Sequence, residues 1–335
     1  MTPKQTPFPS RSRVLGTGSY APKRVLTNGD LERMVATSDE WIVTRTGIRE
    51  RRVAAEGEDT SDMAVVAARK ALDMAGVAPQ DLDMIVVGTI SADMPLPSCA
   101  AIVQAKLGAS KAFAFDVAAA CAGSLYALSI ADRFIATGGA KRALVIGAEL
   151  LTRLVDWSDR NTCVLFGDAA GAMVLGPSED SSRGLLSAHL HTDGTAADIL
   201  SIPGGGSRTP QSTQVLERKL HKVHMDGREV YKFAVRVLPL AIQEALDANG
   251  LAVADIDHVV SHQANLRIVE SVLERLHVPI EKCWVNLDRY GNTSSASLPI
   301  SLDEANRAGR LKEGDVIAMM AIGAGMAWGG ALMRW

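Results

Sequence analysis

The chain contains 335 residues, of which 47% are hydrophobic and 22% are charged, a balance typical of a globular protein with an ample core. Its length suits one large domain or two ordinary ones, and its net charge of −3 gives no overall basic signal for nucleic acid binding. No apolar run approaches the length of a membrane span, so we expect no membrane partner.

Four cysteines, at positions 99, 121, 163 and 283, lie far apart, each in or beside an apolar run. The first residues contain no apolar signal region, so we expect reduced thiols in a cytoplasmic protein. The sequence has no CxxC pair, and its histidines show no metal spacing completed by cysteines. We therefore predict that the protein has no metal site.

The first glycine-rich segment, GTGSYA at residues 16–21, has some likeness to a dinucleotide-binding fingerprint. That fingerprint requires a helix to begin at the turn, and Pro22 follows the segment at once, which prevents such a helix. We therefore exclude a nicotinamide site here. A charged segment follows at residues 37–62 and is too short to form a separate domain.

Residues 71–86 and 245–260 share one pattern, in which a helix ends at a glycine and a short acidic loop leads into an apolar strand. Eight of the sixteen positions are identical at a shift of 174 residues. Alternating helices and apolar strands of this kind indicate an α/β protein with buried, largely parallel strands.

The same shift relates other parts of the chain. It places the apolar run 143–147 on 317–321, and the region of Cys121 on Asn292–Ser295. Agreement at several places makes a chance similarity of one helix–strand unit the weaker interpretation. We predict two halves that pack about a pseudo-twofold axis, with a boundary near residue 178 and the ranges 1–178 and 179–335.

Cys121 lies in FDVAAACAGS, where an apolar run meets a helix-like run across small residues. A thiol near a helix N-terminus meets partial positive charge and free N–H groups, which favour the thiolate. The small neighbours leave room for another segment or a ligand. A free cysteine is also commonly just a buried core residue, so this position alone does not identify a nucleophile.

Two polar residues of the second half also follow strand-like runs. His262 follows the run DHVVS, and Asn292 follows CWVNL and precedes a helix. Because sites in open α/β sheets collect at the carboxyl ends of strands, we expect Cys121, His262 and Asn292 to meet in one cleft. These residues form a nucleophile with two hydrogen-bonding partners, a set that papain-like proteases also use, so residue types alone leave the reaction open.

The motifs DVAAACAGS, SHQANLRI and YGNTSSAS strongly resemble those of the β-ketoacyl-acyl carrier protein synthase III family, the initiating condensing enzymes of the thiolase superfamily. SDEWIVTRTGIRER and FGDAAGAMVLG resemble this family as well, and the likeness runs from about residue 13 to residue 335. The resemblance implies the thiolase fold, in which two pseudo-twofold-related αβ halves form α-β-α-β-α layers. It also implies an acyltransferase that has no permanently bound cofactor and uses acyl-CoA as a substrate.

The resemblance further implies a decarboxylative Claisen condensation that initiates fatty-acid synthesis. Cys121 would take the acyl group of a short acyl-CoA, and malonyl-acyl carrier protein would lose CO2 to form an enolate that attacks the acyl-Cys carbonyl. His262, donating from Nε2, and Asn292 would hold the malonyl thioester oxygen as charge develops. Backbone N–H groups of Cys121 and of the turn at 323–325, which contains Ala324, would hold the oxyanion of the acyl-Cys intermediate.

Four residues match family positions that bind coenzyme A. Trp41, Arg45 and Arg160 match those that hold its adenine and phosphates, and an indole with a guanidinium can sandwich a purine. Asn265 matches a position along the pantetheine tunnel. The alternative for Trp41 and Arg45, four residues apart, is an ordinary contact on one helix face.

Basic residues in two helical patterns match the region where the family docks the acidic carrier protein. Lys232 and Arg267 are the main candidates, and Arg236 and Arg275 share their helical patterns. A local basic face on an acidic chain suits such a partner, although many surface charges are merely solvated.

The acyl pocket is where the chain departs from the family pattern. Leu96 stands where acetyl-preferring members carry Phe, in a loop that reaches across the family's homodimer to floor the partner's pocket, and Phe166 lines the same pocket. The smaller Leu96 predicts a broadened primer range, because an apolar pocket discriminates by only about 1–3 kcal/mol per methylene. Ile322 and Ala324 also replace the Phe and Gly of the best-known members, and Ala324 keeps its backbone N–H.

Other functions remain open on the motifs alone. A relative that loads starter units in polyketide or other secondary metabolism would share these motifs, and carrier-protein specificity would separate the two. A non-catalytic thiolase-fold partner typically lacks the nucleophilic cysteine, which is present here. A thioester hydrolase or simple acyltransferase would need no decarboxylation site, so the presence of both His262 and Asn292 argues against it.

Overall fold

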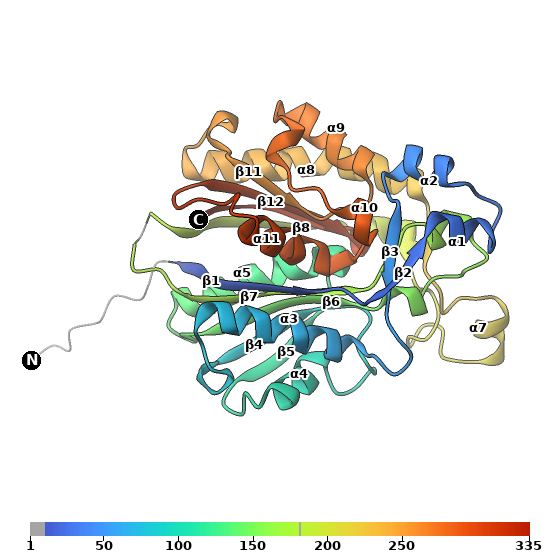
Figure 1. Cartoon of the computed structure of the whole chain (residues 1–335), viewed down its shortest axis with the longest axis horizontal. Coiled ribbons are helices and arrows are strands. Elements are labelled where there is room, and N and C mark those ends of the chain that lie inside the picture. The colour runs from blue at the N-terminus through green and yellow to red at the C-terminus, as the bar shows by residue number, and fades with distance from the viewer. Residues whose placement is uncertain (1–10, 181) are drawn as a thin grey trace, which may run out of the picture.

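The computed structural model describes residues 11–180 and 182–335, so the first ten residues of the predicted N-terminal half lie outside the described residues. Figure 1 shows two stacked sheets, with helices between them and on the outer face of each. The layers follow the order helix, sheet, helix, sheet, helix, and this confirms the predicted layered α/β architecture.

The sheet of the first half has five strands in the order β1, β7, β6, β4, β5. β4 is parallel to both β5 and β6, whereas β7 is antiparallel to both β1 and β6. β4 and β6 are buried along their whole length, as expected for strands covered by helices on both faces. The strands are β1 (Ser12–Tyr20), β4 (Met84–Gly88), β5 (Phe113–Val117), β6 (Ala143–Glu149) and β7 (Ala169–Pro177).

The sheet of the second half has four strands, and they repeat the order and directions of β1, β7, β6 and β4. β13 is antiparallel to both β8 and β12, and β11 is parallel to β12. Cys283 makes an isolated parallel bridge to Val259 at the place that β5 occupies in the first sheet. The strands are β8 (Gly184–Thr192), β11 (His258–Ser261), β12 (Val316–Gly323) and β13 (Ala327–Arg334).

The prediction of largely parallel strands is wrong. The last strand of each half, β7 or β13, is antiparallel to both of its neighbours. β12 and β13 are joined by the short turn at residues 324–326, and a short connection returns the chain antiparallel, whereas a parallel pair needs a long crossover. The predicted strand at 283–287 is also wrong, because this run makes the isolated bridge at Cys283 and then enters α10 (Leu287–Tyr290).

The main helices cover the sheets in matching pairs (Figure 1). α5 and α11 lie between the two sheets, whereas α3 and α8 pack on their outer faces. α3 and α8 both end at a glycine with a φ of 62°, Gly76 and Gly250, which confirms the predicted helix ends. These helices are α3 (Thr60–Ala75), α4 (Cys99–Leu107), α5 (Gly123–Ala136), α8 (Gly227–Asn249), α9 (Leu266–Leu276) and α11 (Ser297–Arg307).

Residues 16–20 of the GTGSYA segment lie in β1, and the two glycines allow this strand to pack closely against α3. A Cβ on Gly16 would come within 2.3 Å of the Ala71 carbonyl oxygen, and one on Gly18 within 2.2 Å of the Ala67 oxygen. The strand and the helix can therefore approach closely only because both side chains are absent. The close packing of β1 on α3 therefore explains why glycine occupies both positions.

Short elements gather at the end of the sheets where the candidate site lies (Figure 1). β2 pairs with β3, and β9 pairs with β10. The elements are β2 (Arg24–Thr27), α1 (Asn28–Glu32), α2 (Asp39–Thr46), β3 (Glu50–Val53), α6 (Arg160–Cys163), β9 (Leu200–Ser201), α7 (Thr213–Glu217) and β10 (His224–Met225).

The cysteines at positions 99, 121, 163 and 283 are all buried and free. Among the described residues, no helix is long and apolar enough to cross a membrane. The same part of the chain holds no group of three His, Cys, Asp or Glu side chains that could bind a metal ion.

Candidate active site

Cys121 lies in a single 3-10 turn, Ala120–Ala122, that joins β5 to α5. Ala120 has a φ of 46°, in the left-handed region that side chains other than glycine rarely adopt. Gly323, at the end of β12, lies against this turn, and a Cβ on it would come within 2.5 Å of the Cys121 nitrogen. Small residues therefore allow the two halves to approach closely at Cys121.

Burial raises the pKa of the Cys121 thiol to about 12, and the Glu149 carboxylate adds to this rise. The Ser294 hydroxyl hydrogen-bonds to the sulfur and lowers the same pKa. Dehydration therefore opposes the thiolate-favouring effect expected from the helix N-terminus, and the thiol is protonated at neutral pH. A group that receives this proton is needed when the sulfur reacts.

His262 directly follows β11, and its backbone N–H donates to the Met320 carbonyl oxygen at 2.8 Å. The side chain is 7% exposed, and burial lowers the pKa of the imidazole to about 4, so the ring is neutral at neutral pH. A neutral imidazole carries one N–H, on either Nδ1 or Nε2. The partner of Nδ1 therefore decides whether Nε2 can donate.

That partner is Ser297, the first residue of α11. Its Oγ lies 2.7 Å from His262 Nδ1 and also 2.7 Å from the Ser294 carbonyl oxygen. The hydroxyl has one proton, so it donates to only one of these acceptors. If it donates to the carbonyl, Nδ1 keeps the ring proton and Nε2 is bare. The predicted role of His262, donation from Nε2, therefore requires Ser297 to donate to the imidazole.

Asn292 is 4% exposed and is held by its backbone beside Phe166. Its N–H donates to the Leu165 carbonyl at 2.8 Å, and Gly167 N–H donates to its carbonyl at 3.0 Å. The side-chain Oδ1 accepts a hydrogen bond from Ser294 N at 2.9 Å. Because Oδ1 is occupied in this way, Nδ2 remains as the donor end of the amide.

The structure brings Cys121, His262 and Asn292 into the wall of one cavity of about 90 Å³. A second cavity, of about 300 Å³, shares Cys121 and Phe166 with the first. Cys121 therefore lies between two chambers walled mainly by apolar side chains, and the first of them also contains His262 and Asn292. We call the first the His–Asn chamber and the second the apolar chamber. The second chamber is lined by Ile90, Leu151, Phe166, Leu200, Ile202, Val223 and Ala324, among others.

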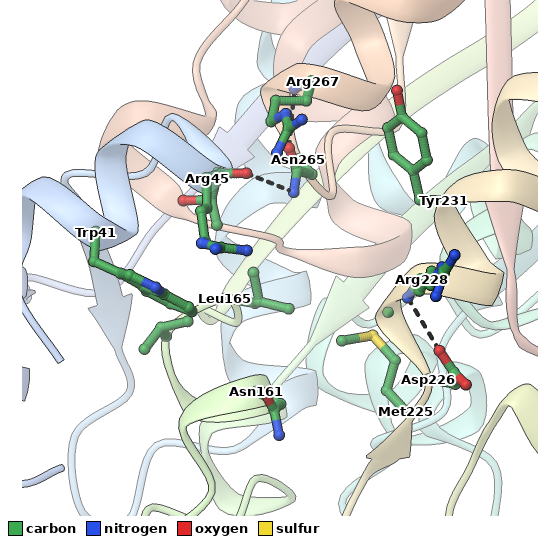
Figure 2. A pocket seen from close by; sticks show the side chains of 13 residues that line it. Trp41, Arg45, Asn161, Leu165, Met225, Asp226, Arg228, Tyr231, Asn265 and Arg267 are labelled. Carbon is green, nitrogen blue, oxygen red and sulfur yellow. Dashed lines mark hydrogen bonds between the residues drawn. The ribbon is translucent and has the colours of Figure 1, made fainter. Parts of the chain in front are cut away.

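A third cavity, of about 740 Å³, opens to the surface and shares Leu165, Met225 and Asn265 with the His–Asn chamber (Figure 2). Three predicted coenzyme A residues, Trp41, Arg45 and Asn265, lie on its wall. We call this cavity the outer cleft. It provides a route from the surface to the chamber that contains Cys121.

The predicted coenzyme A residues lie together at the outer cleft. The guanidinium carbons of Arg45 and Arg160 lie 5.0 and 4.7 Å from the Trp41 ring centroid. Asn265 Nδ2 donates to the Arg45 carbonyl oxygen at 3.0 Å, as Figure 2 shows. The geometry thus places two cations beside one indole, next to the channel toward Cys121.

The predicted docking residues lie on α8 and α9. Arg267, at the start of α9, lines the outer cleft, and Lys232 on α8 forms an exposed ion pair with Glu229 at 2.6 Å. Arg236 lies with its guanidinium 4.9 Å from the Phe233 ring centroid. Arg275 donates to the backbone of α8 at the Val235 carbonyl. Arg267 is therefore at the cleft entrance, whereas Arg275 is occupied in joining the two helices.

The two predicted acyl-pocket residues have different surroundings. Phe166 is 5% exposed and lines both chambers beside Cys121. Leu96 is 84% exposed, in the loop between β4 and α4, and is not among the residues that line these chambers in its own chain. Within one chain, therefore, only Phe166 lies at the pocket.

Three polar residues near the candidate site were missed by the sequence analysis. Ser294 contacts both Cys121 and Asn292, Glu149 accepts a hydrogen bond from Ser294, and Arg228 lines the outer cleft. The sequence contains a usable signal for Glu149, since this lone carboxylate ends the apolar run ALVIGA at a strand's carboxyl end. Ser294 lies within a quoted motif but has no distinguishing residue type.

The layered fold with its buried cysteine defines the class, a condensing enzyme with the thiolase fold. Residues 115–194 match the family model of 3-oxoacyl-(acyl-carrier-protein) synthase III, and residues 246–335 match the model of its C-terminal part. The chain belongs to this family, also called β-ketoacyl-acyl carrier protein synthase III.

Individual relatives agree with this assignment over nearly the whole chain. The β-ketoacyl-acyl carrier protein synthase III of Symbiobacterium thermophilum is 54% identical, covering 96% of this chain and 97% of its own. The crystal structure of the synthase III from Aquifex aeolicus has a TM-score of 0.89 at 46% identity and covers 97% of this chain and 100% of its own. A priming β-ketosynthase of the R1128 polyketide pathway has a TM-score of 0.91 at 38% identity, covering 99% and 98%.

Proposed function

We propose that this chain condenses a short acyl-CoA primer with malonyl-acyl carrier protein to give β-ketoacyl-acyl carrier protein, the first condensation of fatty-acid synthesis. One observation carries the proposal most strongly: Cys121 lies between the apolar chamber and the His–Asn chamber, which contains His262 and Asn292. An acyl group bound to the sulfur would occupy the first, and a malonyl thioester would enter the second. The two reacting carbons would then meet at the sulfur.

In the first half-reaction, Cys121 Sγ attacks the thioester carbonyl of acyl-CoA. A new C–S bond to the enzyme forms, the C–S bond to CoA breaks, and CoA leaves as a thiolate that takes up a proton. Negative charge on the carbonyl oxygen is held by the backbone N–H groups of Cys121 and Ala324. Ala324 lies on the wall of the apolar chamber, which supports this role.

In the second half-reaction, the malonyl group loses CO2 and its C–C bonding electrons form an enolate on the thioester. The donor end of the Asn292 amide and the Nε2–H of His262 stabilise the enolate oxygen. The enolate carbon attacks the acyl-Cys carbonyl, and the sulfur leaves as the new C–C bond forms. The fixed orientation of Asn292, with Oδ1 on Ser294 N, supports its role as a donor.

The outer cleft would bind the long substrate arms. Trp41, Arg45 and Arg160 would hold the adenine and phosphates of CoA, and Asn265 would line the path of the pantetheine arm. Lys232 and Arg267 would attract the acidic carrier protein to the cleft entrance. The position of Arg267 on the cleft wall and the exposure of Lys232 support this arrangement.

A second copy of the chain would complete the acyl pocket. β5 is the edge strand of the five-stranded sheet, and Phe113 at its start is 42% exposed. Leu96 is a large apolar side chain left 84% exposed near the same edge. In a homodimer that pairs the two β5 edges, Leu96 would reach the partner's pocket, and its small size would admit longer or branched primers.

Intact-protein mass spectrometry after incubation with mixed acyl-CoAs tests the acylation step directly. We expect one acyl adduct on the wild-type chain, none on Cys121→Ser, and CO2 release when malonyl-acyl carrier protein is added to the acyl-enzyme. An adduct that persists on Cys121→Ser would refute the assigned nucleophile. Absence of CO2 release from an acylated enzyme would refute the condensation.

The primer range is tested by acylation rates with acetyl-, isobutyryl- and hexanoyl-CoA. We expect the three rates to lie within about tenfold of one another, because Leu96 removes only a few methylene-sized contacts. Strict acetyl preference would contradict the broadened range. Faster condensation with a polyketide carrier protein than with a fatty-acid one would favour the starter-unit alternative.

A further inference from the structure

The thiol of Cys121 needs a proton acceptor, and the described residues offer few. Cys121 is 7% exposed, so bulk water has little access to the sulfur. His262 is a poor acceptor, because its pKa lies near 4 and its proposed role requires a proton on Nε2. The remaining ionisable group at the turn is Glu149, which the condensation itself does not use.

Glu149 ends β6 and is completely buried. Four donors surround its carboxylate: Ser294 Oγ at 3.0 Å, Ser91 Oγ at 2.5 Å, Ile90 N at 3.2 Å and Thr89 Oγ1 at 3.3 Å. Glu149 takes part in none of the ion pairs found among residues 11–180 and 182–335. Burial without a cation raises its pKa to about 7, so it exchanges a proton in the physiological range.

Ser294 connects this carboxylate to the sulfur. Its O–H donates to Glu149 Oε1 at 3.0 Å, and the same hydroxyl interacts with the Cys121 sulfur and lowers the pKa of the thiol. Cys121 and Ser294 also line the same apolar chamber. The residue is held in place by a left-handed φ of 51° and by the bond from its N–H to Asn292 Oδ1. The hydroxyl therefore lies between the thiol and the carboxylate, where it can take up one proton while it passes its own to Glu149.

We propose that Glu149, a positioning residue that acts through the Ser294 hydroxyl, receives the thiol proton of Cys121 during acyl transfer. As Cys121 Sγ attacks acyl-CoA, its proton passes to Ser294 Oγ while the Ser294 hydroxyl proton passes to Glu149 Oε1. The C–S bond to CoA breaks, and the CoA thiolate takes a proton back along the same path. No net proton is gained or lost, and the inference rests on the proposed function for its substrate.

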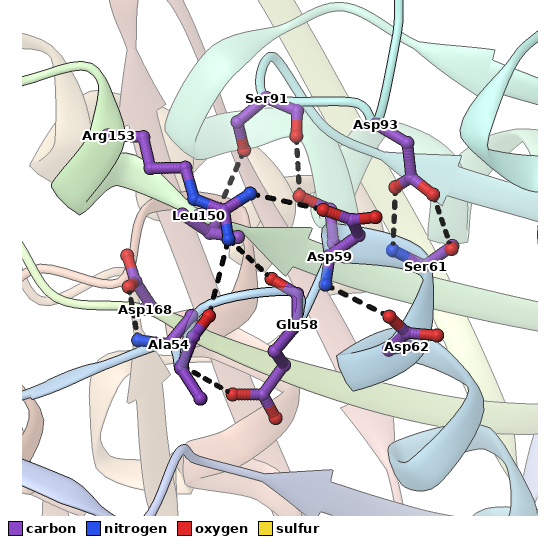
Figure 3. Close-up of polar contacts among 12 residues, drawn as sticks. Ala54, Glu58, Asp59, Ser61, Asp62, Ser91, Asp93, Leu150, Arg153 and Asp168 are labelled. Carbon is purple, nitrogen blue, oxygen red and sulfur yellow. Dashed lines mark hydrogen bonds and ion pairs between the residues drawn. The ribbon is translucent and has the colours of Figure 1, made fainter.

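The far side of Glu149 is anchored to the loop that carries Leu96. Ser91 Oγ donates to Glu149 and accepts from Leu150 N at 2.9 Å, and the Ser91 carbonyl accepts from Thr60 Oγ1 at 2.5 Å. Figure 3 shows the bond between Ser91 and Leu150, and Asp93 of the same loop bound to Ser61 at the start of α3. The carboxylate therefore has fixed partners on both sides.

The titratable groups that face Glu149 are two thiols, Cys121 from the turn before α5 and Cys99 from α4. The Glu149 carboxylate raises the pKa of both, and Asp93 and Asp116 raise that of Cys99 in the same way. The pKa of Glu149 itself is raised by burial and lowered by the hydrogen bonds that it accepts, and burial has the larger effect.

The test measures acylation of Cys121 by acetyl-CoA as a function of pH, in the full-length protein. We expect the wild-type rate to rise with pH through a midpoint near 7, and we expect Glu149→Gln to lose at least tenfold in rate together with this midpoint. Ser294→Ala should have the same effect, because it removes the connecting hydroxyl. Glu149→Asp, which keeps a carboxylate, should recover part of the rate.

Ser91→Ala is the matched control, since it removes a donor to Glu149 on the side away from Cys121. Loss of a hydrogen bond to the charged form raises a carboxyl pKa, so the midpoint should move upward by about one pH unit while the rate at high pH stays near wild type. A merely structural role for Glu149 would lower the rate at every pH and leave the midpoint unchanged, which would overturn the proposal.

Carbamidomethylation of Cys121 by iodoacetamide separates this proposal from the proposed function, because the reagent needs no coenzyme A site. We expect the same midpoint near 7 in the wild-type alkylation rate and its loss in Glu149→Gln. An unchanged alkylation profile in both Glu149→Gln and Ser294→Ala would overturn the relay. Normal alkylation of a wild-type chain that no acyl-CoA acylates would instead refute the proposed function.

Discussion

The turn before α5 and the turn before α11 have nearly the same backbone, although they lie 174 residues apart. Ala120 and Ser294 have φ values of 46° and 51°, both in the left-handed region. The residues before them, Ala119 and Thr293, have ψ values of 27° and 20°. Each turn is one 3-10 unit that runs directly into a central helix.

The side chains at equivalent positions of the two turns have different roles. After the left-handed residue, the first turn presents Cys121 to the two chambers, whereas the second presents Ser295, whose Oγ donates to the Gly88 carbonyl at 2.6 Å. At the left-handed position itself, Ala120 has no polar group, and Ser294 supplies a hydroxyl. A repeated backbone therefore predicts where a site can form, and only the side chains decide which half holds each function.

The largest expected effect concerns Asn292, beside the second turn, and should appear in only one of the two half-reactions. Asn292→Ala should reduce CO2 release from malonyl-acyl carrier protein by about 100-fold or more, since it removes one preorganised donor to the enolate oxygen. Acylation of Cys121 should stay within about threefold of wild type, because the first half-reaction does not use that donor. The two rates are measured by CO2 trapping and by mass spectrometry of the acyl-enzyme. Equal losses in both rates would contradict the assignment of Asn292 to the second half-reaction.

The sequence predicted the two-half α/β fold because the repeat is carried by local features. Helix ends at Gly76 and Gly250 and the apolar runs of β6 and β12 depend on nearby residues alone, and the structure confirms them. Strand direction depends on which strands become neighbours, which a local pattern does not contain. The antiparallel placement of β7 and β13 was therefore missed.

The same limit applies to the candidate site. Cys121, His262 and Asn292 could be proposed from motifs at strand ends, and they do line one cavity. Glu149 and Ser294 are 145 residues apart, and only the packed fold shows their hydrogen bond. Likewise, the Ser297 contact that controls the His262 tautomer follows from the position of α11 beside β11 and from no sequence spacing.

A second prediction tests the start of the central helices, where Gly123 of α5 corresponds to Ser297 of α11. Ser297→Ala should slow CO2 release by about tenfold, because a lost hydrogen bond of about 1–1.5 kcal/mol no longer holds the N–H of His262 on Nε2. Acylation should be nearly unchanged. Ser301→Ala, on the same helix and bound to Gln263, is the control and should release CO2 within about twofold of wild type. A similar loss in both variants would assign Ser297 a structural role only.

The third prediction concerns the cost of burying the imidazole of the second half. The pKa of His262 is lowered from 6.5 to about 4 by burial, so below pH 6.5 the unfolded chain binds a proton that the folded chain does not. Stability should therefore fall as the pH drops from 6.5 toward 4, by about 2 kcal/mol at pH 5 from this group. His262→Gln should lack that part of the loss in urea unfolding measured at pH 7.5 and 5. Identical pH dependence in both proteins would contradict the assignment.

The smallest expected effect is a direct test of the strain in the first turn. Ala120→Gly should stabilise the protein by up to about 1 kcal/mol, because glycine adopts a φ of 46° without the steric cost of a Cβ, less its greater freedom in the unfolded chain. Two residues on, Ala122 has a φ of −86° and is fully buried, so Ala122→Gly should instead destabilise by about 1–2 kcal/mol. Urea unfolding of the two variants should thus give shifts of opposite sign. Shifts of the same sign would mean that the left-handed conformation of Ala120 carries no strain. Ala120 and Ser294 would then share a backbone conformation without a shared energetic cost.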